Sequence, residues 1–254
     1  MLFDTHMHTE YSTDSKMKLT DAIAKAKEFN KGIIITEHLD PIYPKEDEFR
    51  CDIQSYINDY SKYRDNNVLL GIEIGLSDIM VEYDETIGND HNLDYIIGSI
   101  HSVNNDDIYL DYPKLSLPKY EYFKKYFEYM KKVISLHNNF DSLGHIDYIC
   151  RYSPFEDNNM DVVMFKKELS EIFELLISKN KVLELNTVRL LNDDTRKNVY
   201  DIFSLYKEVG GKYITIGSDA HNSNDVFRNW DLAIQLCTDL ELTPVYFKNR
   251  KMIV

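Results

Sequence analysis

The chain has 254 residues, which is enough to bury a sizeable core in one large α/β domain. Its net charge of −14 argues against a nucleic-acid-binding surface, and no apolar run approaches the roughly 18 residues that a membrane span needs. The N-terminus lacks the basic and apolar regions of a secretory signal, and three widely spaced cysteines favour reduced thiols. A cytoplasmic location is therefore expected.

Short β-branched segments alternate with amphipathic helical segments along the whole chain. Strands are predicted at residues 2–8, 32–38, 68–76, 95–101, 141–149, 181–187 and 213–221. Apolar spacing predicts helices at residues 19–26, 52–66, 123–134, 162–176, 199–206 and 225–238. Residues 39–51 and 103–118 are longer loops, and no repeat or composition break divides residues 1–254. This alternation predicts one α/β domain with a parallel sheet, as a closed barrel or a doubly wound sheet.

Histidines and carboxylates recur at the positions where predicted strands end. Six of the eight histidines and two carboxylates lie at or near these carboxyl ends: His6, His8, His38, Glu73, His101, His145, Asp219 and His221. In barrels and open sheets this edge is where catalytic groups converge. His91 and His137 lie in loop or helix-end segments and are expected to be structural. One strand histidine is usually a hydrogen-bonded structural residue, but repetition at one edge favours a shared site.

The residue types at this edge indicate a metal site. The set holds imidazoles and carboxylates without thiolates, which suits Zn²⁺, Mn²⁺ or Fe in hydrolytic or Lewis-acid chemistry. A catalytic zinc uses about three protein ligands and keeps one position open. Because the chain offers more ligands than one ion needs, at least two metals sharing a bridging carboxylate are expected.

Six short motifs resemble those of the polymerase-and-histidinol-phosphatase (PHP) family. They are H-M-H at 6–8, T-E-H at 36–38, G-I-E-I at 71–74, G-S-I-H at 98–101, G-H-I-D at 144–147 and G-S-D-A-H at 217–221. The resemblance covers nearly the whole chain and implies a distorted (β/α)7 TIM-like barrel with up to three metals. Within the family, D-T-H-M-H and L-E-L-N-T are most similar to the monofunctional histidinol-phosphate phosphatases.

The resemblance implies two to three divalent ions held by three groups of residues. The first group is His6, His8, Glu73 and Asp219; the second is Glu73, His101 and His145; the third is Asp14, His38 and His221. Glu73 would bridge the first two ions.

These ions imply hydrolysis of a phosphate monoester, with histidinol phosphate as the expected small metabolite. Three divalent ions outweigh the three carboxylates that hold them, so the site attracts a phosphate dianion despite the acidic protein. Metal coordination lowers the pKa of water towards about 7, which makes a bridging hydroxide available to attack phosphorus in line. Glu73, Asp219 and His221 are the expected catalytic residues, and His221 or Asp219 is placed to protonate the leaving alkoxide.

Arginines and one acidic loop are candidates for substrate binding. Arg151 and Arg189 follow the fifth and sixth predicted strands and would complete a phosphate clamp, although ordinary surface ion pairs explain them equally well. The acidic loop 37–49, which includes Asp40 and Glu46, would face the cationic end of histidinol phosphate; a role in solubility alone is the alternative.

Other functions remain open from the sequence. A PHP phosphoesterase acting on a phosphotyrosine, nucleotide or sugar phosphate would use the same ligands, because they contact only the phosphate. An amidohydrolase also begins with a strand-one HxH pair, but usually bridges its metals with a lysine. A non-catalytic metal-binding PHP module is the third alternative. The native metal, the exact substrate and the oligomeric state are not fixed by the sequence.

Overall fold

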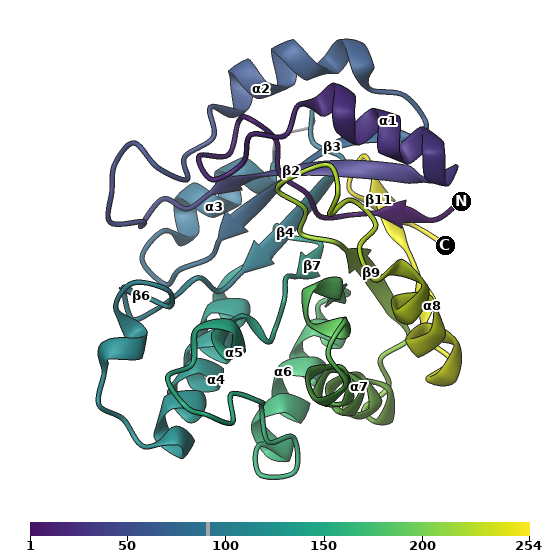
Figure 1. Ribbon diagram of the computed structural model, residues 1–254. Coiled ribbons are helices and arrows are strands. Elements are labelled where there is room, and N and C mark those ends of the chain that lie inside the picture. Colours follow the sequence, from purple (N-terminus) through teal and green to yellow (C-terminus); the bar gives the residue numbers. More distant parts are fainter. Residues whose placement is uncertain (90–91) are drawn as a thin grey trace.

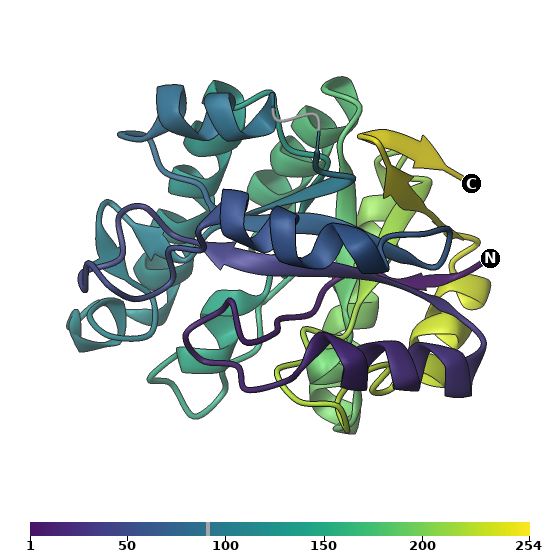
Figure 2. The same cartoon turned by 90° about the horizontal axis from the view of Figure 1, so that it is seen from above.

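A computed structural model describes residues 1–89 and 92–254, and a parallel sheet forms its centre (Figures 1 and 2). In spatial order the strands are β1 (Phe3–Asp4), β2 (Gly32–Leu39), β3 (Val68–Gly75), β4 (Tyr95–Ser99), β7 (Ser142–Leu143), β8 (Val182–Asn186), β9 (Tyr213–Gly217) and β10 (Thr243–Pro244). All neighbouring pairs in this sheet are parallel. The strands follow one another in space in the same order as along the chain. This is expected when each crossover brings the chain back to the amino ends of the strands and the next strand pairs with the previous one.

The sheet curls until its first strand approaches the seventh. Beyond β1, the N–H of Thr5 donates to the carbonyl of Ile216 at 2.9 Å, and the N–H of Asp219 donates to the carbonyl of His6 at 2.8 Å. A parallel bridge also joins Met7 to Ala220. The predicted single-domain TIM-like α/β fold is thereby confirmed, with β10 as an additional short strand beside β9.

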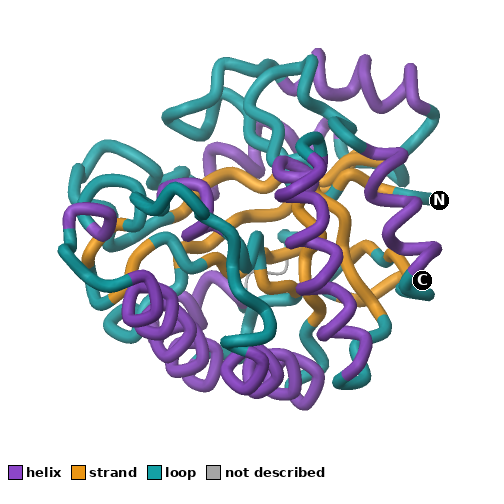
Figure 3. Tube along the Cα trace, turned by 60° about the horizontal axis from the view of Figure 1, so that its bottom comes forward, coloured by secondary structure: helices purple, strands orange, loops and turns teal. Residues whose placement is uncertain are grey.

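Helices surround the strands and cover the outer face of the sheet (Figure 3). The longer ones are α1 (Leu19–Phe29), α2 (Ile53–Tyr60), α3 (Val81–Gly88), α4 (Lys119–Leu136), α6 (Lys166–Ser178), α7 (Asp193–Glu208) and α8 (Trp230–Asp239). Shorter helical segments are α5 (Tyr148–Tyr152) and 3-10 turns at Ser61–Tyr63, Tyr112–Lys114 and Thr187–Leu190. Among the described helices, none combines the length and apolar character needed to cross a membrane.

Strand periodicity divides the barrel interior into two ends. On β2, Ile34 and His38 share the inner face because side chains alternate with a period of two. Ile34 packs with Phe3, Leu69 and other apolar side chains near the amino ends of the strands. His38 lies instead near the carboxyl end, where the interior becomes polar. Apolar packing near the amino ends thus holds the strands together, and the candidate site lies at the polar end, where the strands have their carboxyl ends.

The C-terminal tail closes the apolar end. It forms a small antiparallel hairpin of β11 (Tyr246–Lys248) and β12 (Lys251–Ile253), which the sequence analysis did not predict. Tyr246 stacks on Phe3 with ring centroids 4.0 Å apart, and Phe247 stacks on Tyr95 at 5.4 Å. These contacts cover the apolar end of the barrel. Both chain termini lie close to this end (Figures 1 and 2).

Several predicted boundaries are wrong. The strand predicted at 141–149 ends at Leu143. The N–H of Gly144 still donates to the carbonyl of Gly98 on β4 at 3.0 Å, and the close approach of Ser99 leaves no room for a Cβ at this position. Residues 148–152 form α5 instead. Helix α3 was not predicted, and the loop 103–118 contains part of a hairpin of β5 (Ser102–Val103) and β6 (Asp106–Asp107). His91 lies outside the described residues.

Candidate metal centre

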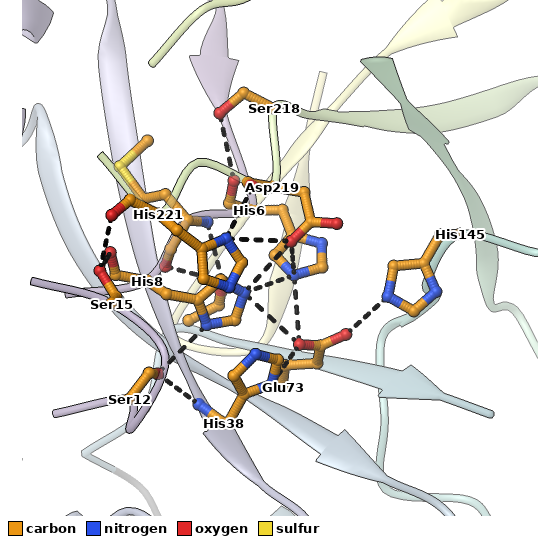
Figure 4. A network of polar contacts seen from close by, with 12 residues as sticks. His6, His8, Ser12, Ser15, His38, Glu73, His145, Ser218, Asp219 and His221 are labelled. Carbon is orange, nitrogen blue, oxygen red and sulfur yellow. Dashed lines mark hydrogen bonds and ion pairs between the residues drawn. The ribbon is translucent and has the colours of Figure 1, made fainter. Parts of the chain in front are cut away.

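The structure brings every predicted ligand to the carboxyl end of the barrel. His6 and His8 follow β1, and His38 and Glu73 lie on β2 and β3 (Figure 4). The other predicted ligands follow later strands or lie in the first loop. Those remaining residues are Asp14, His101, His145, Asp219 and His221. Most are buried, and Asp14 and His221 are the more exposed members at 38% and 29%. Residues more than two hundred positions apart in the chain therefore share one cluster.

Glu73 is at the centre of this cluster, as expected for a bridging carboxylate. Its side chain is fully buried and lies within 3.5 Å of ring nitrogens from five histidines. Oε1 is 2.9 Å from His145 and 3.3 Å from His101, whereas Oε2 is 2.9 Å from His38, 3.3 Å from His6 and 3.5 Å from His8. The two carboxylate oxygens thus face two different groups of imidazoles.

The first predicted ligand group lies together on one side of Glu73. Nε2 of His6 and Nε2 of His8 are 3.0 Å apart. Oδ1 of Asp219 lies 3.6 Å from the first of these nitrogens and 3.5 Å from the second. Asp219 has φ 53°, a left-handed conformation that turns the chain sharply after β9 and directs its carboxylate towards the cluster.

The second and third groups occupy the other side and the rim. The second has candidate donor atoms of Glu73, His101 and His145 within 4.8 Å of one another. In the third, Asp14 Oδ2 lies 3.0 Å from His221 Nε2 and 3.6 Å from His38 Nε2. The structure therefore brings together the members of each predicted group.

The outer ring nitrogens of four histidines already have hydrogen-bond partners. The Nδ1 partners are Glu184 Oε1 for His6 at 2.6 Å, Ser12 Oγ for His8 at 3.2 Å, Asp40 Oδ1 for His101 at 2.9 Å and the Asp219 carbonyl for His221 at 3.0 Å. An acceptor at Nδ1 holds the proton there and leaves Nε2 as a lone-pair donor. This pattern, in which Nε2 faces the cluster, is typical of metal-binding imidazoles.

Two further buried atoms face each other without forming a hydrogen bond. His38 Nδ1 and Glu73 Oε2 are 2.9 Å apart, yet both lack a hydrogen-bond partner. Buried polar groups in native proteins are normally satisfied, so each such pair needs a physical explanation. A cation between these lone pairs would supply the missing interaction. The donor chemistry and the geometry of the cluster both fit divalent metal ions.

Electrostatics in the cluster favour charged carboxylates. Burial alone would raise the pKa of Glu73, but His6, His101 and His38 hold that pKa well below its usual value. Burial lowers the pKa of His38, but Glu73 and Asp14 outweigh it and raise the pKa to about 10. Metal ions bind imidazole only in its neutral form, so protons and metals compete for the same nitrogens.

The PHP domain model matches residues 4–188, which is more than half of the sequence. The chain belongs to the PHP domain family. The matched range ends before β9, so Asp219 and His221 lie outside it, although the structure places both in the same cluster as the matched ligands.

Relatives of this PHP domain include histidinol-phosphatases. A probable histidinol-phosphatase of Clostridium acetobutylicum is 40% identical over 252 residues, covering 99% of both chains. A histidinol-phosphatase of Lactococcus lactis subsp. lactis is 30% identical over 239 residues, covering 89% of this chain and 86% of the relative. A crystal structure of histidinol phosphate phosphatase from that species, complexed with Zn, L-histidinol and phosphate, has a TM-score of 0.90 and 26% identity. That similarity covers 100% of this chain and 99% of the other.

The two predicted arginines have different surroundings in this PHP domain. Arg151 lies on α5, where its Nη1 donates to Asp219 Oδ2 at 2.8 Å. Its Nε and Nη2 are buried without a hydrogen-bond partner. Arg189 donates to Asp147 at 3.1 Å and to Asn159 at 2.6 Å. Arg151 is therefore in contact with the cluster of candidate ligands, whereas Asp147 and Asn159 engage both terminal nitrogens of Arg189.

Two carboxylates next to the ligands were not predicted in these roles. Glu184 contacts His6, and Asp40 contacts His101 at the far nitrogen of each ring. In V-L-E-L-N, Glu184 lies between two leucines that point to the opposite face of the strand. An acidic residue in the middle of an otherwise apolar strand could have indicated a role for Glu184 in the site. Asp40 was assigned to a substrate-facing loop instead. His137 lies outside the cluster and pairs with Asp84 at 3.0 Å, as expected for a structural histidine.

A cavity of about 510 Å³ opens beside the cluster. The two long loops and α5 supply most of its lining, which consists of Asp14, His38, Asp40, Tyr43, Lys45, Glu48, Phe49, His101, Asp107, Tyr109, Leu110, Tyr148 and Tyr152. Aromatic rings extend outward from the ligands: His101 to Tyr148 at 4.9 Å, Tyr148 to Tyr152 at 5.2 Å and Tyr152 to Tyr109 at 5.0 Å. The cavity thus joins the cluster to an aromatic and acidic wall.

Proposed function

We propose that this PHP domain, spanning residues 1–254, is a cytoplasmic, metal-dependent histidinol-phosphatase that converts L-histidinol phosphate and water into L-histidinol and phosphate. The observation that carries the proposal is the convergence of the nine predicted ligands in one cluster, with Glu73 in contact with five of the histidines. The relative complexed with Zn, L-histidinol and phosphate supports the same substrate for this chain.

Two or three divalent ions, zinc, manganese or iron, would occupy the centre. The groups proposed to hold them are His6, His8, Glu73 and Asp219; Glu73, His101 and His145; and Asp14, His38 and His221. Bound ions would activate the attacking water and neutralise charge on the phosphate. Glu73 supports this arrangement because its two oxygens face different imidazoles.

Arginine side chains would orient the phosphate. Arg151 is well suited to this role because Asp219 holds one end of its guanidinium, while Nε and Nη2 have no hydrogen-bond partner. A guanidinium can donate two parallel hydrogen bonds to a phosphate. For Arg189 we propose a secondary role in phosphate binding, because its hydrogen bond to Asp147 places its guanidinium beside the loop that follows the ligand His145.

The leaving alkoxide needs a proton, and His221 is a better donor than Asp219. Oδ2 of Asp219 accepts hydrogen bonds from Arg151 and Asn186, while Oδ1 faces His6 and His8. These neighbours stabilise the charged carboxylate and keep it from holding a proton. His221 donates through Nδ1 to the Asp219 carbonyl, so only its Nε2 remains available. That nitrogen can bind a third ion or carry the proton, but not both at once.

The cavity would hold the histidinol portion. Its amine is cationic and its imidazole is a flat ring, which match carboxylates and aromatic walls respectively. Asp107 accepts N–H groups from Tyr109 and Leu110 through Oδ1, which fixes its carboxylate at the cavity wall. Asp107 and Glu48 are therefore better candidates than Asp40, which contacts His101, or Glu46, which does not line the cavity.

A substrate screen with metal analysis tests the proposal. Purified protein would be assayed for metal content and for phosphate release from histidinol phosphate, phosphotyrosine, a nucleotide and a sugar phosphate. We expect two or three metal equivalents and the highest kcat/KM for histidinol phosphate. A higher kcat/KM for another ester would support a different PHP phosphoesterase, and metal binding without turnover would support a non-catalytic module. For the substrate cavity, Asp107→Asn should raise KM for histidinol phosphate more than KM for a small neutral phosphate ester.

A further inference from the structure

Glu184 links two ligands that belong to different proposed metal groups. It lies on β8 with only 1% of its surface exposed. Oε1 is 2.6 Å from Nδ1 of His6, and Oε2 accepts the backbone N–H of His145 at 2.7 Å. His6 follows the first strand and His145 follows the fifth strand of the sheet, so one carboxylate spans the barrel interior between them.

The packing around Glu184 leaves its carboxylate little freedom. On the neighbouring strand β9, a Cβ at Gly217 would collide with Glu184 Oε1 and would lie 2.5 Å from Cβ of His6. Glycine at position 217 therefore provides the space in which Glu184 and His6 meet. A side chain at that position would push one of them out of its present geometry.

We propose that Glu184 is a positioning residue of the metal centre, holding His6 and the His145 backbone in place so that their ligand atoms face opposite oxygens of Glu73. The proposal rests on the metal-dependent function proposed above. Through Nδ1, Glu184 keeps the proton on the outer side of the His6 ring and directs Nε2 inward. Through the His145 amide, it fixes the residue whose Nε2 lies 2.9 Å from Glu73.

A glutamine at position 184 gives a sharp test of this double role. The carboxylate of Glu184 offers two acceptor oxygens, whereas a glutamine amide offers one acceptor and one donor. Glutamine can therefore satisfy either the His6 N–H or the His145 N–H, but not both. Aspartate keeps both acceptors on a shorter side chain and should restore less than the full geometry.

The primary measurement is metal affinity, which does not depend on turnover. We expect Glu184→Gln to weaken metal binding in a chelator competition by roughly 10- to 100-fold, the usual effect of losing a partner behind a metal ligand. The absorption spectrum of the cobalt-substituted protein should change as well. Asp84→Asn is the matched control, because Asp84 forms a buried contact with His137 outside the centre at 3.0 Å. That variant should lower thermal stability without changing the chelator midpoint.

Wild-type metal affinity and cobalt spectrum in Glu184→Gln would overturn the proposal. If that variant does not fold, ¹⁵N NMR of the zinc-loaded wild-type histidines gives the answer. A proton on Nδ1 of His6 with zinc on Nε2 supports the positioning role, and zinc on Nδ1 overturns it. If the wild type binds metal but releases no phosphate from histidinol phosphate, the proposed substrate fails while these metal measurements still test Glu184.

Discussion

Replacing Glu73 with glutamine removes one negative charge from the centre of the cluster while nearly keeping the volume of the side chain. Glu73 is fully buried, and its oxygens lie 2.9 to 3.5 Å from nitrogens of five histidines. The variant should fold, because glutamine nearly keeps the volume of the side chain and the ring stacking of Tyr246 on Phe3 and of Phe247 on Tyr95 at the apolar end does not involve this residue. The consequences should therefore appear in metal binding and in catalysis.

The expected magnitude follows from the two proposed groups that share Glu73. Both the first and the second ion would lose a carboxylate ligand, whereas the group of Asp14, His38 and His221 would keep all of its members. Metal content should fall to about one equivalent or less. Loss of the bridged pair should reduce kcat/KM by at least about a thousand-fold, which corresponds to about 4 kcal/mol at about 1.4 kcal/mol per tenfold.

Metal analysis and phosphate release, measured on the same dialysed preparation, provide the assay. Circular dichroism and gel filtration would establish that the variant is folded, and Asp84→Asn serves as a control for the loss of a buried carboxylate elsewhere. Full metal content together with turnover within tenfold of the wild type would refute the bridging role of Glu73. Loss of metal in the control variant as well would show that metal loss reports general destabilisation.

Three other outcomes test separate parts of the centre. Asp14→Asn should remove the third ion while leaving two equivalents by metal analysis, since the other two groups do not contain it. Arg151→Gln should raise KM for histidinol phosphate about tenfold, or about 1.4 kcal/mol, because Nε and Nη2 are proposed phosphate donors. Burial opposes protonation of His137, but Asp84 raises its pKa above 6.5. This raised pKa stabilises the fold below pH 6.5, and the benefit disappears as pH rises through the pKa of the folded protein. Urea unfolding of His137→Gln should consequently show a larger loss of stability at pH 6 than at pH 9.

The ligands were predictable because they depend on strand ends. Each parallel strand delivers its carboxyl end to the same edge, so His38 on β2 and Glu73 on β3 could be placed together without knowledge of side-chain contacts. Indeed, the two residues are register partners in the sheet. Paired positions such as His6 and His8 followed from the period of two along a strand.

The partners behind the ligands were harder to predict. Glu184 and Asp40 act on ring nitrogens that face away from the cluster, and which nitrogen faces outward depends on side-chain torsions. Sequence spacing carries no information about these torsions. The predicted strand at 141–149 failed for a similar reason, since apolar residues 146 and 149 continue the pattern although the strand ends at Leu143 and α5 begins at Tyr148. Packing against the rest of the barrel determines that turn.

The position of the cluster also explains how a chain with a net charge of −14 can bind a phosphate. The acidic residues of the centre face imidazoles, and the proposed ions would make the net charge of this region positive. The negative charges on the distant surface do not cancel it, because solvent and salt screen them. Without metal, His38 Nδ1 and Glu73 Oε2 face each other at 2.9 Å as a buried ion pair, and neither atom has a hydrogen-bond partner. Metal binding to the folded chain would remove that deficit, so ligand binding and fold stability are linked at this end of the barrel. The apolar end, closed by Tyr246 and Phe247, contains none of these ligands and can hold the strand ends in place whether or not metal is bound.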